Sequence, residues 1–124
     1  MLSIRGVYEV AIRVKDLARS ERFYCDVLGF EPGLRDDHRH WLFLWVGDKA
    51  GVVVLQQHPT GFASQHLAFT VEDAELERAA VVLKQQGIAI EGPVVHEWMH
   101  ARSLYFPDPD GHDLELCARI GHPT

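Results

Sequence analysis

The feature that most constrains this chain is an internal repeat of one supersecondary pattern. Val14-Lys15-Asp16 begins a predicted helix that ends at Gly29. Val71-Glu72-Asp73 begins a second predicted helix that ends at Gly87. An alternating, strand-like segment precedes each helix, and further strand-like segments follow it. Self-similarity of this kind constrains the architecture before any single motif is considered. The sequence therefore predicts two copies of a βαβββ unit.

Length and charge limit the class of protein. A chain of 124 residues predicts a single domain, 1–124, with its own core. The formal net charge of −6, without a lysine or arginine cluster, argues against nucleic acid as a partner. The absence of a signal-peptide pattern or of an apolar run near membrane-spanning length predicts a cytoplasmic protein without a membrane partner. Two cysteines, Cys25 and Cys117, make no disulfide framework.

The repeat divides the chain into a first module at about 5–57, a linker at about 58–64 and a second module at about 65–119. In the first module we expect strands at 7–14, 30–35, 40–46 and 52–57, and a helix at 16–29. In the second we expect a strand at 66–71, a strand in two short pieces, 88–90 and 94–96, broken by Gly92-Pro93, and the last two strands at 101–106 and 112–117. A helix is expected at 73–86. Asp16 and Asp73 are the expected helix caps.

Strand alternation places three possible ligands on one side of the sheet. In the first strand Ile12 and Val14 face the helix, which turns Glu9 to the opposite face. By the same alternation, His66 and Glu115 lie opposite the apolar residues of their strands. Glu9 and His66 each lie five residues before the repeated valine, so a pseudo-two-fold axis would bring them side by side.

Simpler interpretations stand beside this one. Glu9 alone would be read as an exposed carboxylate at a strand edge. Of the eight histidines, only His66 lies inside a convincing strand, and the others, His112 included, are expected in loops or at the surface. Asp108 to Gly111 is predicted to be a turn, with Gly111 at positive φ.

Three segments resemble the signatures of the vicinal-oxygen-chelate superfamily. They are Glu9–Phe30, His66–Asp73 and Tyr105–Leu116. This superfamily includes glyoxalase I, bleomycin-resistance proteins, extradiol dioxygenases and fosfomycin-resistance thiol transferases. The resemblance implies an α+β protein whose two βαβββ modules form a curled mixed sheet, the glyoxalase/bleomycin-resistance fold, paired in a homodimer.

The resemblance also implies one divalent metal ion per site, with Glu9, His66 and Glu115 as ligands. Glu9 replaces the histidine that is most common at the first position. Two carboxylates and one imidazole suit Mn²⁺, Fe²⁺, Ni²⁺, Co²⁺ or Zn²⁺. The altered ligand set makes dioxygenase chemistry less favoured. Glu9 and Glu115 are also the candidate catalytic residues, since either can move a proton.

Glyoxalase I enzymes carry one more carboxylate, on the strand that corresponds to 52–57. Different alignments put Leu55, Val54 or Gln56 at that position, and none of these is a base. The fourth metal position is therefore Gln56 or water.

Substrate-binding residues are expected in the loop before the seventh strand, where Trp98, His100 and Arg102 lie, and at Gln56. Arg102 is suited to hold an anionic substrate group bidentately. A solvated loop is the simpler alternative. Trp41, Phe43 and Trp45 share one face of their strand, as a pocket wall or as core.

The leading hypothesis is a metal-dependent, glyoxalase-like isomerase or lyase acting on a small substrate that chelates the metal through vicinal oxygens. One alternative is a fosfomycin-type thiol transferase. Another is a non-catalytic binding protein of the bleomycin-resistance kind, in which acidic groups attract a cationic ligand.

Overall fold

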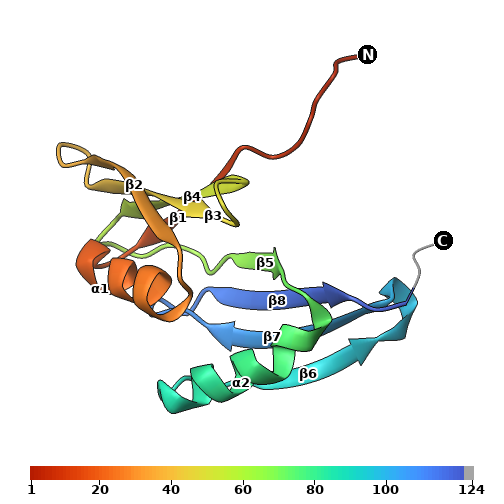
Figure 1. Cartoon of the computed structure of the whole chain (residues 1–124). Coiled ribbons are helices and arrows are strands. Elements are labelled where there is room, and N and C mark those ends of the chain that lie inside the picture. The colour runs from red at the N-terminus through yellow and green to blue at the C-terminus, as the bar shows by residue number, and fades with distance from the viewer. Residues whose placement is uncertain (122–124) are drawn as a thin grey trace. The chain divides into compact units, whose positions relative to one another are not determined.

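The computed structural model describes residues 1–121, which form two compact units that divide between Ala63 and Ser64 (Figure 1). The elements of the first unit are β1 (Glu9–Val14), α1 (Leu17–Arg22), the π-helical turn η1 (Phe23–Val27), β2 (Glu31–Asp36), β3 (Trp41–Val46) and β4 (Gly51–Gln57). Those of the second are β5 (His66–Thr70), the 3₁₀ turn η2 (Asp73–Glu75), α2 (Leu76–Gln85), β6 (Glu91–His96), the 3₁₀ turn η3 (Glu97–Met99), β7 (Ala101–Pro107) and β8 (Asp113–Arg119).

The two units share one sheet topology. The strand order is β1-β4-β3-β2 in the first unit and β5-β8-β7-β6 in the second. The first pair of each sheet is parallel and the other pairs are antiparallel. This arrangement confirms the predicted α+β fold of two βαβββ modules.

The first helical segment is capped by Asp16 and is followed by Gly29, as its sequence predicts, but only its first part is an α-helix. The carboxylate of Asp16 accepts a hydrogen bond from the backbone N–H of Arg19 at 3.1 Å, which caps α1. The chain then widens into η1 and turns at Gly29, whose φ of +79° is unfavourable for other residues. The α-helix proper is therefore shorter than predicted.

The second helix begins differently. Asp73 opens the 3₁₀ turn η2 and makes no side-chain capping bond, so the predicted cap at Asp73 is wrong. The physical reason is that its carboxylate accepts a hydrogen bond from Arg102 instead. One strand prediction is also wrong, because 88–90 is not a strand and β6 runs through Gly92-Pro93 with a register shift.

Helix-facing side chains form the core of each unit. In the first unit α1 packs on β3 and β4, and Ile12, Val14, Leu42 and Leu44 are at most 1% exposed. Full burial of such a side chain contributes roughly 1.5–3 kcal/mol. The alternate residues of β3, Trp41, Phe43 and Trp45, are only partly buried and lie on the opposite face. The aromatic residues are therefore not core under the helix.

In the second unit α2 packs on β6 and β7. Leu76, Leu104 and Leu114 are fully buried there. His112 lies in the loop before β8 but is fully buried, so its expected exposure at the surface is wrong. His122 lies outside the described residues.

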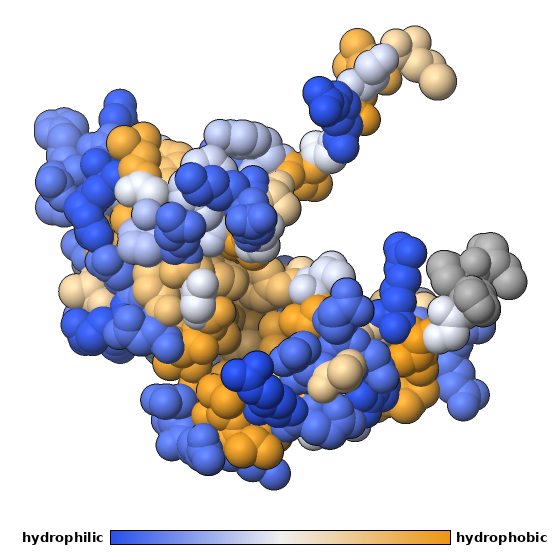
Figure 2. Space-filling model, viewed as in Figure 1, coloured by the Kyte–Doolittle hydropathy of each residue, from blue (hydrophilic) through white to orange (hydrophobic). Residues whose placement is uncertain are grey.

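The first eight residues form no helix or strand and carry exposed apolar side chains, among them Leu2, Ile4 and Val7 (Figure 2). The carbonyl of Tyr8 accepts a hydrogen bond from Val52 N–H at 3.1 Å, which continues the β1–β4 pairing by one residue. Among residues 1–121, no helix is long and apolar enough to cross a membrane.

Candidate metal centre

His66 and Glu115 meet on one face of the second sheet. The strands β5 and β8 are parallel neighbours, and Glu115 is in register with Ala68, two residues beyond His66. His66 Nε2 lies 3.0 Å from Glu115 Oε1. Glu115 is only 7% exposed, whereas the side chain of His66 is 54% exposed. The pair therefore joins a buried carboxylate to an imidazole that solvent or a ligand can reach.

A buried serine holds the other oxygen of Glu115. The hydroxyl of Ser103 on β7 donates to Glu115 Oε2 at 2.6 Å, and Ser103 is fully buried. A buried carboxylate without partners would cost several kcal/mol, so this bond and His66 together make Glu115 tolerable. Sequence reasoning missed Ser103, although its position on the same face as Tyr105 follows from strand alternation.

The donor set of this pair fits a divalent metal ion. A neutral imidazole nitrogen and a carboxylate oxygen are both common ligands of first-row divalent metals, and Ser103 orients the carboxylate from behind. Within residues 1–121, no group of three or more His, Cys, Asp or Glu side chains is arranged to hold a metal. Of the three predicted ligands, the structure brings His66 and Glu115 together.

The third predicted ligand, Glu9, is an exposed residue of β1 in the first unit. Its register position matches that of His66, since Glu9 pairs with Val52 as His66 pairs with Asp113. The two residues are thus equivalent in the two copies of the fold.

The register also identifies the counterpart of Glu115 in the first unit. Val54 pairs with Ala11 and Phe43, as Glu115 pairs with Ala68 and Tyr105. Val54 is fully buried. The position that carries a carboxylate in the second unit is therefore apolar in the first. Gln56, two residues further along β4, is partly buried.

A second polar pair lies on the same face as Glu115. His96 Nε2 is 2.7 Å from the hydroxyl of Tyr105, the residue in register with Glu115 on β7. The ring of Trp98 meets that of His96 edge to face, with centroids 6.4 Å apart. This pair brings a second imidazole and a phenol close to the candidate ligands.

Trp98 and His100 lie in the turn between β6 and β7, as predicted. Trp98 is 82% exposed. His100 adopts the left-handed conformation, and its carbonyl accepts a hydrogen bond from the N–H of Ile120 at 2.9 Å. The turn is therefore attached to the end of β8.

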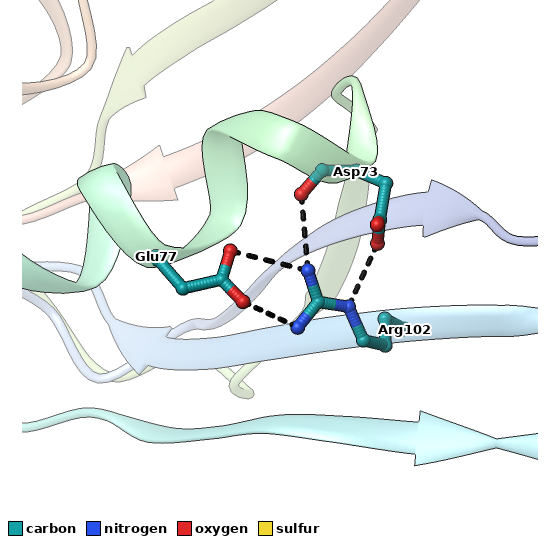
Figure 3. Close-up of polar contacts among 3 residues, drawn as sticks. All are labelled: Asp73, Glu77 and Arg102. Atoms are coloured by element: carbon teal, nitrogen blue, oxygen red, sulfur yellow. Dashed lines mark hydrogen bonds and ion pairs between the residues drawn. The ribbon is translucent and has the colours of Figure 1, made fainter.

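Arg102 lies within β7, as the strand predicted at 101–106 implies, and not with Trp98 and His100 in the preceding loop. Its guanidinium donates to Asp73 Oδ1 at 2.7 Å and to Glu77 Oε1 at 2.6 Å (Figure 3). Chiefly the hydrogen bonds with Glu77, and then those with Asp73, raise the pKa of Arg102. Because Ser103 faces Glu115, its neighbour Arg102 faces the helix side of the sheet. Arg102 connects α2 to β7.

These observations agree with comparisons to known proteins. The model of the Glyoxalase/Bleomycin resistance protein/Dioxygenase superfamily matches residues 6–116. The chain therefore belongs to this superfamily, as its motifs predict.

Individual relatives cover almost the whole chain. The uncharacterized protein YaeR of Escherichia coli (strain K12) is 33% identical over 94% of this chain and 98% of its own length. Glutathione transferase FosA of Serratia marcescens is 32% identical over 91% of this chain and 80% of its own length. A crystal structure of an integron cassette protein from the mobile metagenome of Halifax Harbour Sewage Outfall is 50% identical, with a TM-score of 0.89 over 93% of this chain and 99% of that one.

Proposed function

We propose that the protein is a metal-dependent, glyoxalase-like enzyme of the isomerase or lyase class. Its substrate is a small molecule that chelates the metal through vicinal oxygens. The observation that carries the proposal is the pair of His66 and Glu115, 3.0 Å apart and supported by the buried hydroxyl of Ser103. Membership of the superfamily supports a homodimer and a small-molecule ligand as further parts of the proposal.

In this proposal His66, Glu115 and Glu9 hold one divalent ion, of Mn²⁺, Fe²⁺, Ni²⁺, Co²⁺ or Zn²⁺. Such an ion, when bound, acts as a Lewis acid that stabilises negative charge on substrate oxygens. Ser103 fixes the direction of the Glu115 carboxylate. Both oxygens of Glu115 have partners, which leaves Glu9 as the better candidate to carry a proton.

Glyoxalase I enzymes carry an additional carboxylate on the strand that corresponds to β4. In this protein the equivalent position is Val54, so proton transfer to or from the substrate cannot use a carboxylate there. Val54 has no titratable group, and Gln56 is an amide. Besides Glu9, the hydrogen-bonded pair of Tyr105 and His96 is able to exchange a proton close to Glu115. The proposal therefore assigns proton transfer to Glu9 or to the pair of Tyr105 and His96.

The decisive experiment measures metal and turnover in wild-type protein and in His66→Ala side by side. We expect about one divalent ion per chain in the wild type and none in the variant. Turnover of the hemithioacetal of methylglyoxal and glutathione should disappear with the metal, while circular dichroism stays unchanged. Metal-free wild type that cannot be reloaded with any of the five ions, or a variant that keeps its metal and activity, would reject the proposal.

Thiol transfer to an antibiotic is the second candidate. The specific observation in its favour is the 32% identity to glutathione transferase FosA over 91% of this chain. The same metal site would then activate fosfomycin toward a thiol. Glutathione consumption with fosfomycin, and survival of expressing cells on fosfomycin, distinguish this reaction from isomerisation.

A metal-free binding protein is the third candidate. The partly buried Trp41, Phe43 and Trp45 and the net charge of −6 favour a flat cationic ligand. Stoichiometric uptake of bleomycin that a chelator does not affect would support this function over either enzyme.

A further inference from the structure

We propose that His112 is a positioning residue for the candidate metal centre. It sets where β5 begins beside β8, and thereby where His66 stands against Glu115. This inference rests on the proposed function, because it concerns the same site. It assigns a role to a buried histidine and to the turn before β8, which the sequence suggests is only a reversal of the chain.

The turn from Asp108 to His112 is held by its own hydrogen bonds. Asp108 Oδ1 accepts from the N–H of Asp110 at 2.9 Å and from the N–H of His112 at 2.8 Å. The N–H of Asp108 donates to the carbonyl of His112 at 3.0 Å, and Gly111 adopts a φ of +84°. Asp108 is 5% exposed. This network of hydrogen bonds fixes the backbone from which the imidazole of His112 extends.

The side chain of His112 extends from this turn to the residue that precedes β5. The backbone N–H of Gln65 donates to His112 Nδ1 at 2.9 Å. Because Nδ1 is the acceptor, the geometry assigns the proton of the neutral ring to Nε2. The N–H of Asp113 donates to the carbonyl of Gln65 at 2.8 Å, and the hydroxyl of Ser64 donates to the carbonyl of Gly111 at 2.8 Å. Three bonds thus hold 64–65 against 111–113.

The residue that follows Gln65 is His66. The first register pair of the parallel strands is His66 with Asp113, immediately after the bonds of His112. His66 is therefore attached at its N-terminal side to the turn that leads into the strand of Glu115. A strand slip of one residue moves every side chain to the other face of the sheet, so a fixed starting point decides whether the pair forms.

The imidazole combines two properties, and variants can separate them. It fills volume in a fully buried site and it presents one acceptor to Gln65. In His112→Asn the amide oxygen can stand where Nδ1 stands, with loss of volume. In His112→Leu most of the volume is kept, but no acceptor remains. A purely space-filling role predicts that Asn is the worse replacement, whereas the positioning role predicts that Leu is worse for the metal site.

The test is Ni²⁺ binding by calorimetry to full-length protein, with thermal unfolding of the same samples. For His112→Leu we expect Ni²⁺ affinity to fall roughly 10–100-fold, as on removal of groups that support ligands. His112→Asn should stay within about threefold of wild type, although it melts at a lower temperature. His112→Gln, whose polar end lies nearer the Nε2 position, replaces His112→Leu if that variant does not fold. Wild-type affinity in the folded Leu or Gln variant, or equal losses in Asn and Leu, would overturn the inference.

A second measurement does not need the metal. In metal-free wild type, ¹⁵N NMR of the imidazoles reports the contact of His66 with Glu115, and hydrogen exchange reports the protection of the Gln65 amide. Both signals should change in His112→Leu and persist in His112→Asn. If wild type binds none of the five ions, the proposed function fails, and these NMR signals alone decide the role of His112. An unchanged His66 signal in His112→Leu overturns that role whether or not metal binds.

Discussion

The two units carry the same strand order and register, yet their equivalent positions contain different chemistry. Where the second unit has His66 and Glu115, the first has Glu9 and Val54. Where the second has Ser103 beside the buried carboxylate, β3 of the first has Trp41. The first unit thus presents an aromatic face and the second a polar one. The repeat preserves the scaffold, and within residues 1–121 side-chain replacement gives only the second unit a buried carboxylate paired with an imidazole.

The helices differ in the same way. Asp16 and Asp73 are equivalent residues of the repeat, but Asp16 caps its helix and Asp73 binds Arg102. The position of Arg102 corresponds to His40 in the first unit, which lies just before β3. At the start of the helix in the first unit, the aspartate makes a local capping bond. In the second unit the equivalent aspartate is hydrogen-bonded to the distant strand β7.

The variant with the largest expected effect is Val54→Glu. It places a carboxylate in the first unit at the position equivalent to Glu115 in the second. Val54 is fully buried, and the new charge would lack the serine that supports Glu115. We expect the free energy of unfolding at pH 7 to fall by about 3–5 kcal/mol. Burial raises the pKa of such a carboxyl, so the deficit should shrink as the pH falls toward 4. Denaturant titration measures both effects, with Val54→Gln as the neutral control of similar size. Equal stability of the two variants at pH 7 would show that this position does not penalise charge.

Ser103→Ala should have the next largest effect. Removing the donor from the buried Glu115 is expected to lower the free energy of unfolding by about 1–3 kcal/mol. Affinity for Ni²⁺ should fall about tenfold, because the carboxylate loses its orientation. The matched control is Ser20→Ala, which removes a fully buried serine from the first unit. It should change stability without changing Ni²⁺ affinity, and parallel losses in both variants would remove Ser103 from the site.

Glu77→Gln should have the smallest effect and a characteristic pH dependence. The hydrogen bond with Arg102 lowers the pKa of Glu77 below its model-compound value of 4.5. Its contribution to stability is therefore present above that value and is lost as the pH falls through the pKa of the folded state. Since the side chain is 64% exposed, we expect Tm to fall by only about 1–3 °C at pH 7. The difference from wild type should close near pH 3, as thermal scans across pH would measure. A constant difference across that range would exclude the carboxylate as its cause.

The sequence predicts the scaffold of this protein well because the scaffold depends on periodicity. Alternation places Ile12 and Val14 in the core, and Gly29 and Gly87 end the helices at positive φ. The same alternation correctly puts His66 on the face away from the core. Patterns of this kind follow from the local geometry of strands and helices, so they can be predicted from the sequence alone.

The parts that the sequence does not predict depend on contacts between distant strands. No residue close to Asp73 in the sequence indicates that Arg102 will donate a hydrogen bond to its carboxylate. Ser103 can be recognised as a partner of Glu115 only once β7 is known to pair with β8. The buried state of His112 depends likewise on Gln65, 47 residues away. A polar side chain is buried only where such distant partners satisfy its hydrogen bonds. Its burial therefore cannot be predicted from the residues adjacent to it in the sequence.

Adjacent residues of β7 serve opposite sides of the sheet, Arg102 for the helix and Ser103 for the buried carboxylate. A single-residue insertion or deletion inside this strand would exchange the two side chains. It would put a guanidinium beside the buried Glu115 and a hydroxyl under α2, so both the bond to the helix and the support of the carboxylate would be lost together. Single substitutions in β7 keep this alternation of faces, whereas a shift of one residue reverses it.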